Sequence, residues 1–229
     1  MTAWAQTVTG RALNFSAPVV DAEHLFTEVA HGLSLIARFA GQTDTAYSVA
    51  QHSVLMAEAC EDEIDDPLVA AYCLLHDGHE AYLGDTPSPA EAAIEAEMLS
   101  AAAEAGVPDQ IVEAQIARWR TLRRRIEQRL DTVIHRAAGL PPIDDRARTL
   151  VKSYDVRALK TERRDLMTVP PRPWHPAVEP AQPLALRQGR IRPWPAGVAA
   201  ERFILALNRL CPNAALAAGR LVESEMRNA

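Results

Sequence analysis

The most informative part of the sequence runs from residue 74 to residue 87 and reads Leu74-Leu75-His76-Asp77-Gly78-His79-Glu80-Ala81-Tyr82-Leu83-Gly84-Asp85-Thr86-Pro87. Upstream of it, Asp66-Pro67 is a helix-start signal, because aspartate caps helices and proline suits their first position. We therefore expect a helix from Pro67 to about His79, followed by a loop over residues 84–87. A His-Asp doublet at a helix end can place an imidazole and a carboxylate on one ion.

Two other residues are candidate partners for this doublet. His52 lies within a helix expected from Ser48 to about Cys60, and Asp155 within one expected from Asp144 to Leu166. Apolar neighbours flank both residues, and a polar side chain that faces an apolar core needs a partner. A single divalent metal ion would satisfy all four groups, namely His52, His76, Asp77 and Asp155.

The composition bounds the fold and the class of protein. The chain has 229 residues, of which 48% are apolar, 24% charged and 5% aromatic. Abundant alanine and leucine with few alternating β-branched residues favour helices, so we expect an all-α fold. The net charge of −6 argues against a general nucleic-acid-binding protein. Three scattered cysteines without a C-x-x-C pair predict neither a disulfide framework nor a cysteine zinc site, but buried thiols in a cytoplasmic protein.

The remaining chain divides into further expected elements. The first twenty residues are expected to be irregular, and the spacing over 21–39 predicts a helix. Ser88-Pro89-Ala90-Glu91 has the form of a capping box that opens a helix to about Ala105. The following segment to residue 138 is rich in arginine, which is typical of a solvated helix face. No signal peptide and no membrane-spanning stretch is expected.

A proline-rich segment precedes the C-terminal helix. Residues 170–195 hold eight prolines together with Trp174 and Trp194. The tryptophans indicate that this segment packs on the rest of the protein. A last clear helix is expected over 199–210. We therefore expect a core over 1–168 with an insertion at about 88–118, and a C-terminal part over 169–229 that packs on it.

Taken in context, the pattern H…HD…D resembles the HD-domain phosphohydrolases. The context consists of Arg38-Phe39, residues 47–53, residues 74–87 and residues 155–162. It is similar in particular to the branch that contains bacterial YfbR-type 5′-deoxynucleotidases and small phage dATP triphosphohydrolases. The resemblance covers about residues 22–168, with the insertion interrupting it, and implies an HD-domain helical core.

The resemblance also implies roles for residues around the four metal ligands. Glu80 would orient or activate the attacking water, and Asp85 would handle a proton near the reacting oxygens. Arg38 would grip the phosphate. Phe39 stands where relatives carry a tryptophan near the sugar. His79 is a substrate contact, an extra acid or, as we favour, a partly exposed histidine. Read by themselves, the first three could equally be a helix-end glutamate, a turn aspartate and a surface salt bridge.

These residues predict metal-dependent hydrolysis of a nucleotide phosphate. The favoured substrates are 5′-(deoxy)nucleoside monophosphates, which would yield nucleoside and phosphate. The alternatives are a dNTP triphosphohydrolase that releases polyphosphate, and a non-catalytic, metal-stabilised nucleotide-binding module. Two histidine ligands favour Co, Mn or Zn over Mg. Glu162, two helical turns after Asp155, is interpreted as support for a ligand. Proteins of the family it resembles form dimers or larger rings, so a homo-oligomer is expected by analogy.

Overall fold

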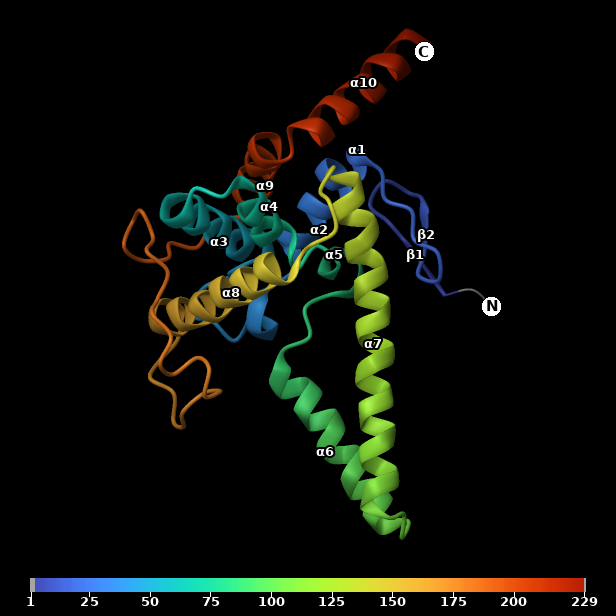
Figure 1. Ribbon diagram of the computed structural model, residues 1–229, viewed down its shortest axis with the longest axis vertical. Helices are drawn as coiled ribbons and strands as arrows, with labels where there is room; N and C mark the ends of the chain where they lie inside the picture. Colours follow the sequence, from blue (N-terminus) through green and yellow to red (C-terminus); the bar gives the residue numbers. More distant parts are fainter. Residues whose placement is uncertain (1–2, 229) are drawn as a thin grey trace.

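The computed structural model describes residues 3–228, with side chains up to residue 220, as an assembly of helices and one small hairpin (Figure 1). The all-α expectation is confirmed. In chain order the elements are β1 (Trp4–Gln6), β2 (Ala12–Asn14), α1 (Ala22–His24), the π-helical turn η1 (Leu25–Val29), α2 (Ala30–Leu35), the 3₁₀ turn η2 (Arg38–Gly41), α3 (Val49–Ile64), α4 (Pro67–Leu75), α5 (Glu80–Leu83), α6 (Ser88–Glu104), α7 (Asp109–Ala137), α8 (Asp145–Leu166), α9 (Ala196–Leu210) and α10 (Pro212–Asn228).

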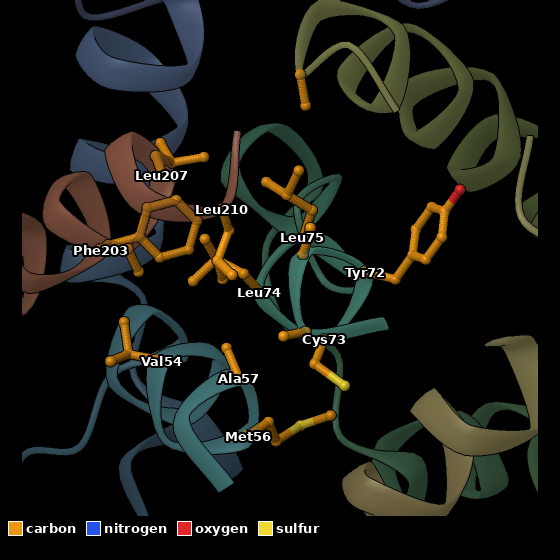
Figure 2. Packing of buried hydrophobic residues seen from close by; sticks show 14 of the residues in the cluster. Val54, Met56, Ala57, Tyr72, Cys73, Leu74, Leu75, Phe203, Leu207 and Leu210 are labelled. Carbon is orange, nitrogen blue, oxygen red and sulfur yellow. The ribbon is translucent and has the colours of Figure 1, made fainter. Parts of the chain in front are cut away.

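Helix α4 is the centre of the core. All its residues from 69 to 75 are buried, since the helix is apolar on every side and neighbours cover it all round. It packs against α3, α7, α8 and α9. Figure 2 shows Leu74 of α4 together with Val54 of α3 and Phe203 of α9, from three parts of the chain. The C-terminal end of this buried helix delivers His76-Asp77, so the doublet is held by the core.

The structure corrects two expected helix ends. The helix that starts near Asp21 stops at Leu35, because Ile36 and Ala37 are extended, and Ala37 forms an isolated antiparallel bridge with Ser48. The helix from Pro67 ends at Leu75, a turn follows, and the short helix α5 starts at Glu80. Both interruptions lie beside the candidate site.

The N-terminal residues were expected to be irregular, but β1 and β2 pair as an antiparallel hairpin. A buried carboxylate attaches this hairpin to the helices. Glu28 accepts hydrogen bonds from Arg11 at 2.8 and 2.7 Å and from the Tyr82 hydroxyl of α5 at 2.9 Å. Burial alone would raise the pKa of Glu28, but these donors lower it to about 2.

Helices α6 and α7 form a long antiparallel hairpin that projects from the helical body (Figure 1). The expected capping box at its start is wrong. Pro87 is the N-cap residue and Ser88 the first helical residue, without a side-chain capping bond. Arginines of α7 pair with acidic residues, as expected for a solvated face: Arg120 with Glu95, and Arg123 with Glu91. That residues 88–118 are an insertion stays a prediction.

The proline-rich segment 170–195 is a loop fastened to α3 and α8. The buried Gln51 side chain donates to the Arg192 carbonyl and accepts from the Trp194 backbone N–H, both at 2.8 Å. On α8, the Thr161 hydroxyl accepts from the Leu184 N–H at 2.8 Å. The segment therefore has a defined path although it lacks regular structure. Within the described residues, no helix combines the length and apolar character required to cross a bilayer.

Gly32 is required for the close approach of α2 and α5. A Cβ at this position would lie 3.0 Å from the Ala81 carbonyl oxygen and 3.2 Å from its Cα. Because these are backbone atoms, Gly32→Ala must displace α5, and we expect a loss of about 1–3 kcal/mol in the free energy of unfolding, measured in urea. Gly197→Ala is the matched control, since its Cβ meets nothing within 4 Å. A neutral result for Gly32→Ala would contradict the close contact.

Candidate active site

Two histidines face each other across the centre of the candidate site. The Nε2 atoms of His52 and His76 lie 3.2 Å apart. The Nδ1 of His76 lies 2.9 Å from the Cys73 carbonyl oxygen, which can only accept, so Nδ1 carries a proton. The Nδ1 of His52 lies 2.5 Å from a Glu162 carboxylate oxygen and donates in the same way. In the neutral form of each imidazole the proton is therefore on Nδ1, and both Nε2 atoms direct lone pairs at one point.

Carboxylates complete this convergence of acceptors. Oδ1 of Asp155 lies 3.8 Å from His52 Nε2. Oδ2 of Asp77 lies 3.0 Å from His76 Nε2 and 3.7 Å from His52 Nε2. Ligand atoms of His52, His76 and Asp155 all lie within 4.8 Å of one another. Asp77 is outside this set of three, although its Oδ2 lies close to both imidazoles. A set of lone pairs this close repels itself unless a cation lies among them, and two imidazoles with carboxylates suit a divalent transition metal.

The pKa shifts of His76 and Asp77 also favour a positive charge within the cluster. Burial lowers the pKa of His76, but Asp77 and Asp155 outweigh it and raise the pKa to about 9. Burial opposes ionisation of Asp77, yet His76, His52 and Arg38 hold its pKa well below the usual range. The Asp77 carboxylate is thus ionised and favours a positive charge on His76.

Glu162 contacts the side of His52 that faces away from His76, and it is completely buried. Its carboxylate accepts from His52 Nδ1 at 2.5 Å, from the Tyr47 hydroxyl at 3.0 Å and from Arg38 Nη2 at 3.4 Å. Burial would raise the pKa of Glu162, but Arg38 and His52 lower it to about 2. Glu162 therefore fixes the orientation and tautomer of His52, as the spacing from Asp155 indicated.

Glu80 and Asp85 lie near the cluster, Glu80 on α5 and Asp85 in the loop after it. Oε2 of Glu80 is buried without a hydrogen-bond partner. Burial, with the negative charges of Asp77 and Asp85, raises the pKa of Glu80 to about 8. Burial and Asp77 also raise the pKa of Asp85, against the opposing effect of Arg38. An unpartnered buried carboxylate beside a cluster of acceptors is typical of a functional group rather than of a helix-end glutamate.

Arg38 is buried and not part of a surface salt bridge. Its Nη1 donates to Asp77 at 3.2 Å and its Nη2 to Glu162 at 3.4 Å, while Nε is buried without a partner. The bridge between Ala37 and Ser48 brings it here, since the Arg38 N–H donates to the Tyr47 carbonyl at 2.9 Å. The Nε–H group thus remains available for an anion.

His79 is held by a residue of α7. Its Nδ1 lies 2.9 Å from the Asp131 carboxylate. Burial disfavours the charged imidazole, but Asp131 outweighs this effect and raises the pKa of His79. His79 is therefore a half-buried, partnered histidine, and none of the sequence interpretations included its partner.

A groove of about 550 Å³ leads from His76 between α7 and α8. Tyr72 lies against the His135 ring at 5.3 Å, and Arg136 and Arg148 also line the groove. Nε2 of His135 is buried without a partner. The groove joins the metal-ligand cluster to two guanidinium groups.

Sequence reasoning missed several residues of this site. Tyr47 donates to Glu162, the carboxylate that holds His52, and Asp131 holds His79. Trp174 of the proline-rich segment lies against Phe39, with ring centroids 6.0 Å apart. No local pattern marks the first two, because their partners are distant in the chain. The aromatic character of Trp174 did indicate packing, but not its place.

We predict that Glu162→Gln weakens metal binding about 10- to 100-fold. A neutral amide accepts the Nδ1 proton of His52 less strongly than the carboxylate does, and it does not compensate the charge of Arg38. Isothermal titration with Mn²⁺ or Co²⁺ measures the change. Glu63→Gln is the matched control, since Glu63 lies on α3 and pairs with Arg157 away from the cluster. Unchanged affinity in Glu162→Gln, or an equal loss in both variants, would contradict the assignment.

Comparison with known proteins agrees with this geometry. The uncharacterized protein YfdR of Escherichia coli (strain K12) is 34% identical over 142 residues, which cover 62% of this chain and 61% of that protein. An uncharacterized protein of Rhodobacter capsulatus is 42% identical over 98 residues, which cover 40% of this chain and 48% of that protein. The aligned part thus spans about half to three-fifths of these relatives. Residues 39–131 match the family model described as HD domain.

Proposed function

We propose that the protein is a metal-dependent phosphohydrolase that acts on nucleotides, with 5′-(deoxy)nucleoside monophosphates as the favoured substrates. One observation carries the proposal, namely the convergence of two imidazole lone pairs and two carboxylates beside an unpartnered buried glutamate. A purely structural ion would not require that glutamate or a buried arginine with a free donor. The match of residues 39–131 to the HD-domain model and the resemblance to YfbR-type enzymes support the same function.

In this proposal His52, His76, Asp77 and Asp155 hold the divalent ion, for which Co, Mn or Zn is preferred over Mg. A bound ion supplies Lewis acidity toward a phosphate oxygen and acidifies water. Arg38 binds a second phosphate oxygen through its free Nε. Oε2 of Glu80 orients the attacking water and takes up its proton, and Asp85 holds a proton for the leaving oxygen.

The groove between α7 and α8 favours a second candidate, a nucleoside triphosphate that is cut to release polyphosphate. Arg148 lies seven residues before Asp155 on α8, which is about 10 Å along the helix axis. With Arg136 it places two permanent positive charges within a groove that starts at His76. The further phosphates of a triphosphate, attached to the one at the metal, would bind to these two guanidinium groups.

Incubation of the purified protein with all nucleoside mono- and triphosphates tests the function. We expect release of orthophosphate from monophosphates with Mn²⁺, Co²⁺ or Zn²⁺ and loss of activity with EDTA. Release of intact polyphosphate, seen by phosphorus NMR, would select the second candidate. Failure to hydrolyse any nucleotide despite stoichiometric metal would contradict both and favour a non-catalytic nucleotide-binding module.

Glu80→Ala separates catalysis from metal binding. Because Glu80 is not among the ligands, we expect metal affinity to stay unchanged while kcat falls about 100- to 10,000-fold. Glu97→Ala, in an exposed position on α6, is the control and should retain full activity. Normal turnover in Glu80→Ala would show that its role is wrongly assigned.

A further inference from the structure

Phe39 and Trp174 form an aromatic pair beside the candidate active site. Their ring centroids lie 6.0 Å apart at an angle of 52°, and both side chains are partly exposed. Phe39 comes directly after Arg38, whose guanidinium carbon lies 5.4 Å from the Phe39 ring. The aromatic pair is thus next to the cation that contacts Asp77, although Trp174 lies outside the region that matches the HD-domain model.

The backbone at this point is strained. Phe39 has φ 56° and ψ 29°, and Ala40 has φ 51° and ψ 32°, so two successive residues with a Cβ adopt the left-handed conformation. Each such residue costs about 1–3 kcal/mol in general, and strain of this kind concentrates at binding sites. Here it places the Phe39 ring against Trp174 while Arg38 points toward the cluster. A relaxed helical turn would not separate the two neighbouring side chains in this way.

Trp174 is held firmly although it belongs to a proline-rich loop. Its backbone N–H donates to Glu179 at 2.7 Å, and the same carboxylate accepts from Arg163 of α8 at 2.5 Å. The guanidinium carbon of Arg163 lies 5.3 Å from the Trp174 ring. Because α8 also carries Asp155, the indole has a fixed position relative to the metal-ligand cluster.

We propose that Trp174, together with Phe39, forms an aromatic surface on which the planar heteroaromatic ring of the substrate stacks while its phosphate lies at Arg38 and the metal. The inference rests on the proposed function and adds the residue that selects nucleotides among phosphate esters. Stacking suits this purpose, because every nucleobase presents a π-face and each stacked base contributes appreciably to binding. The sugar of a nucleotide then spans from the aromatic surface to the cation.

Kinetics on two substrates test the inference. The ratio of kcat/KM for a nucleoside 5′-monophosphate to that for ribose 5-phosphate, which lacks the ring, measures ring recognition. In Trp174→Ala we expect this ratio to fall about 10- to 100-fold through a higher KM for the nucleotide. Trp174→Phe should restore most of it. Trp194→Phe is the matched control, since Trp194 lies on the same segment but packs against Arg202, and it should leave the ratio unchanged.

A ratio that stays constant in Trp174→Ala, because both substrates are affected equally or not at all, would overturn the inference. Fluorescence gives a readout that does not need turnover. A nucleoside monophosphate should quench tryptophan emission of the Mn²⁺-loaded wild type and of Trp194→Phe, but not of Trp174→Phe. Quenching through Trp174 without hydrolysis would support the aromatic site and contradict the proposed function. Hydrolysis with no quenching and an unchanged ratio would support the proposed function and contradict the aromatic site.

Discussion

The buried carboxylate of Glu162 is the constraint on which the site depends. A fully buried charge is stable only with partners, and Glu162 has them in Arg38, Tyr47 and His52. These donors come from the 3₁₀ turn η2, from the residue before the cap of α3 and from α3 itself. The requirement to compensate one charge therefore fixes α8 against η2 and the start of α3. Removing any donor would leave charge uncompensated at the centre of the protein.

The histidine geometry follows from this constraint. Glu162 holds the proton of His52 on Nδ1, and the Cys73 carbonyl does the same for His76, so that both Nε2 lone pairs point to one place. Asp77 and Asp155 add negative charge there, while Glu80 and Asp85 are raised in pKa by burial and by their acidic neighbours. The arrangement concentrates acceptors at one point, and a divalent cation relieves their mutual repulsion. The same crowding leaves a carboxylate with raised pKa beside the position of that cation.

The site extends beyond the part of the chain that matches the HD-domain model. His52, His76 and Asp77 lie inside residues 39–131, but Arg38 precedes them, and Asp155, Glu162 and Trp174 follow. Helix α8 supplies the candidate ligand Asp155 and the carboxylate of Glu162 that holds His52, while the proline-rich segment supplies the aromatic neighbour of Phe39. Hydrogen bonds from Gln51 and Thr161 fasten that segment to α3 and α8. The proline-rich segment is thereby positioned by α3 and α8, the two helices that carry the candidate ligands His52 and Asp155.

Local sequence was enough to predict the all-α class, the helix starts at Ser48, Asp66 and Asp144, and the residue types of the candidate cluster, because these depend on local propensity, capping and spacing. The ends of the helices after Leu35 and Leu75 were decided by tertiary structure, since the bridge to Ser48 and the packing beside the cluster override local helical preference. The pairing of β1 with β2 also required a distant anchor, Glu28. The partnerships of Tyr47 with Glu162, His79 with Asp131 and Phe39 with Trp174 join residues far apart in the chain. No local pattern encodes such contacts, because they arise only when the packed helices bring distant side chains within hydrogen-bonding or van der Waals distance.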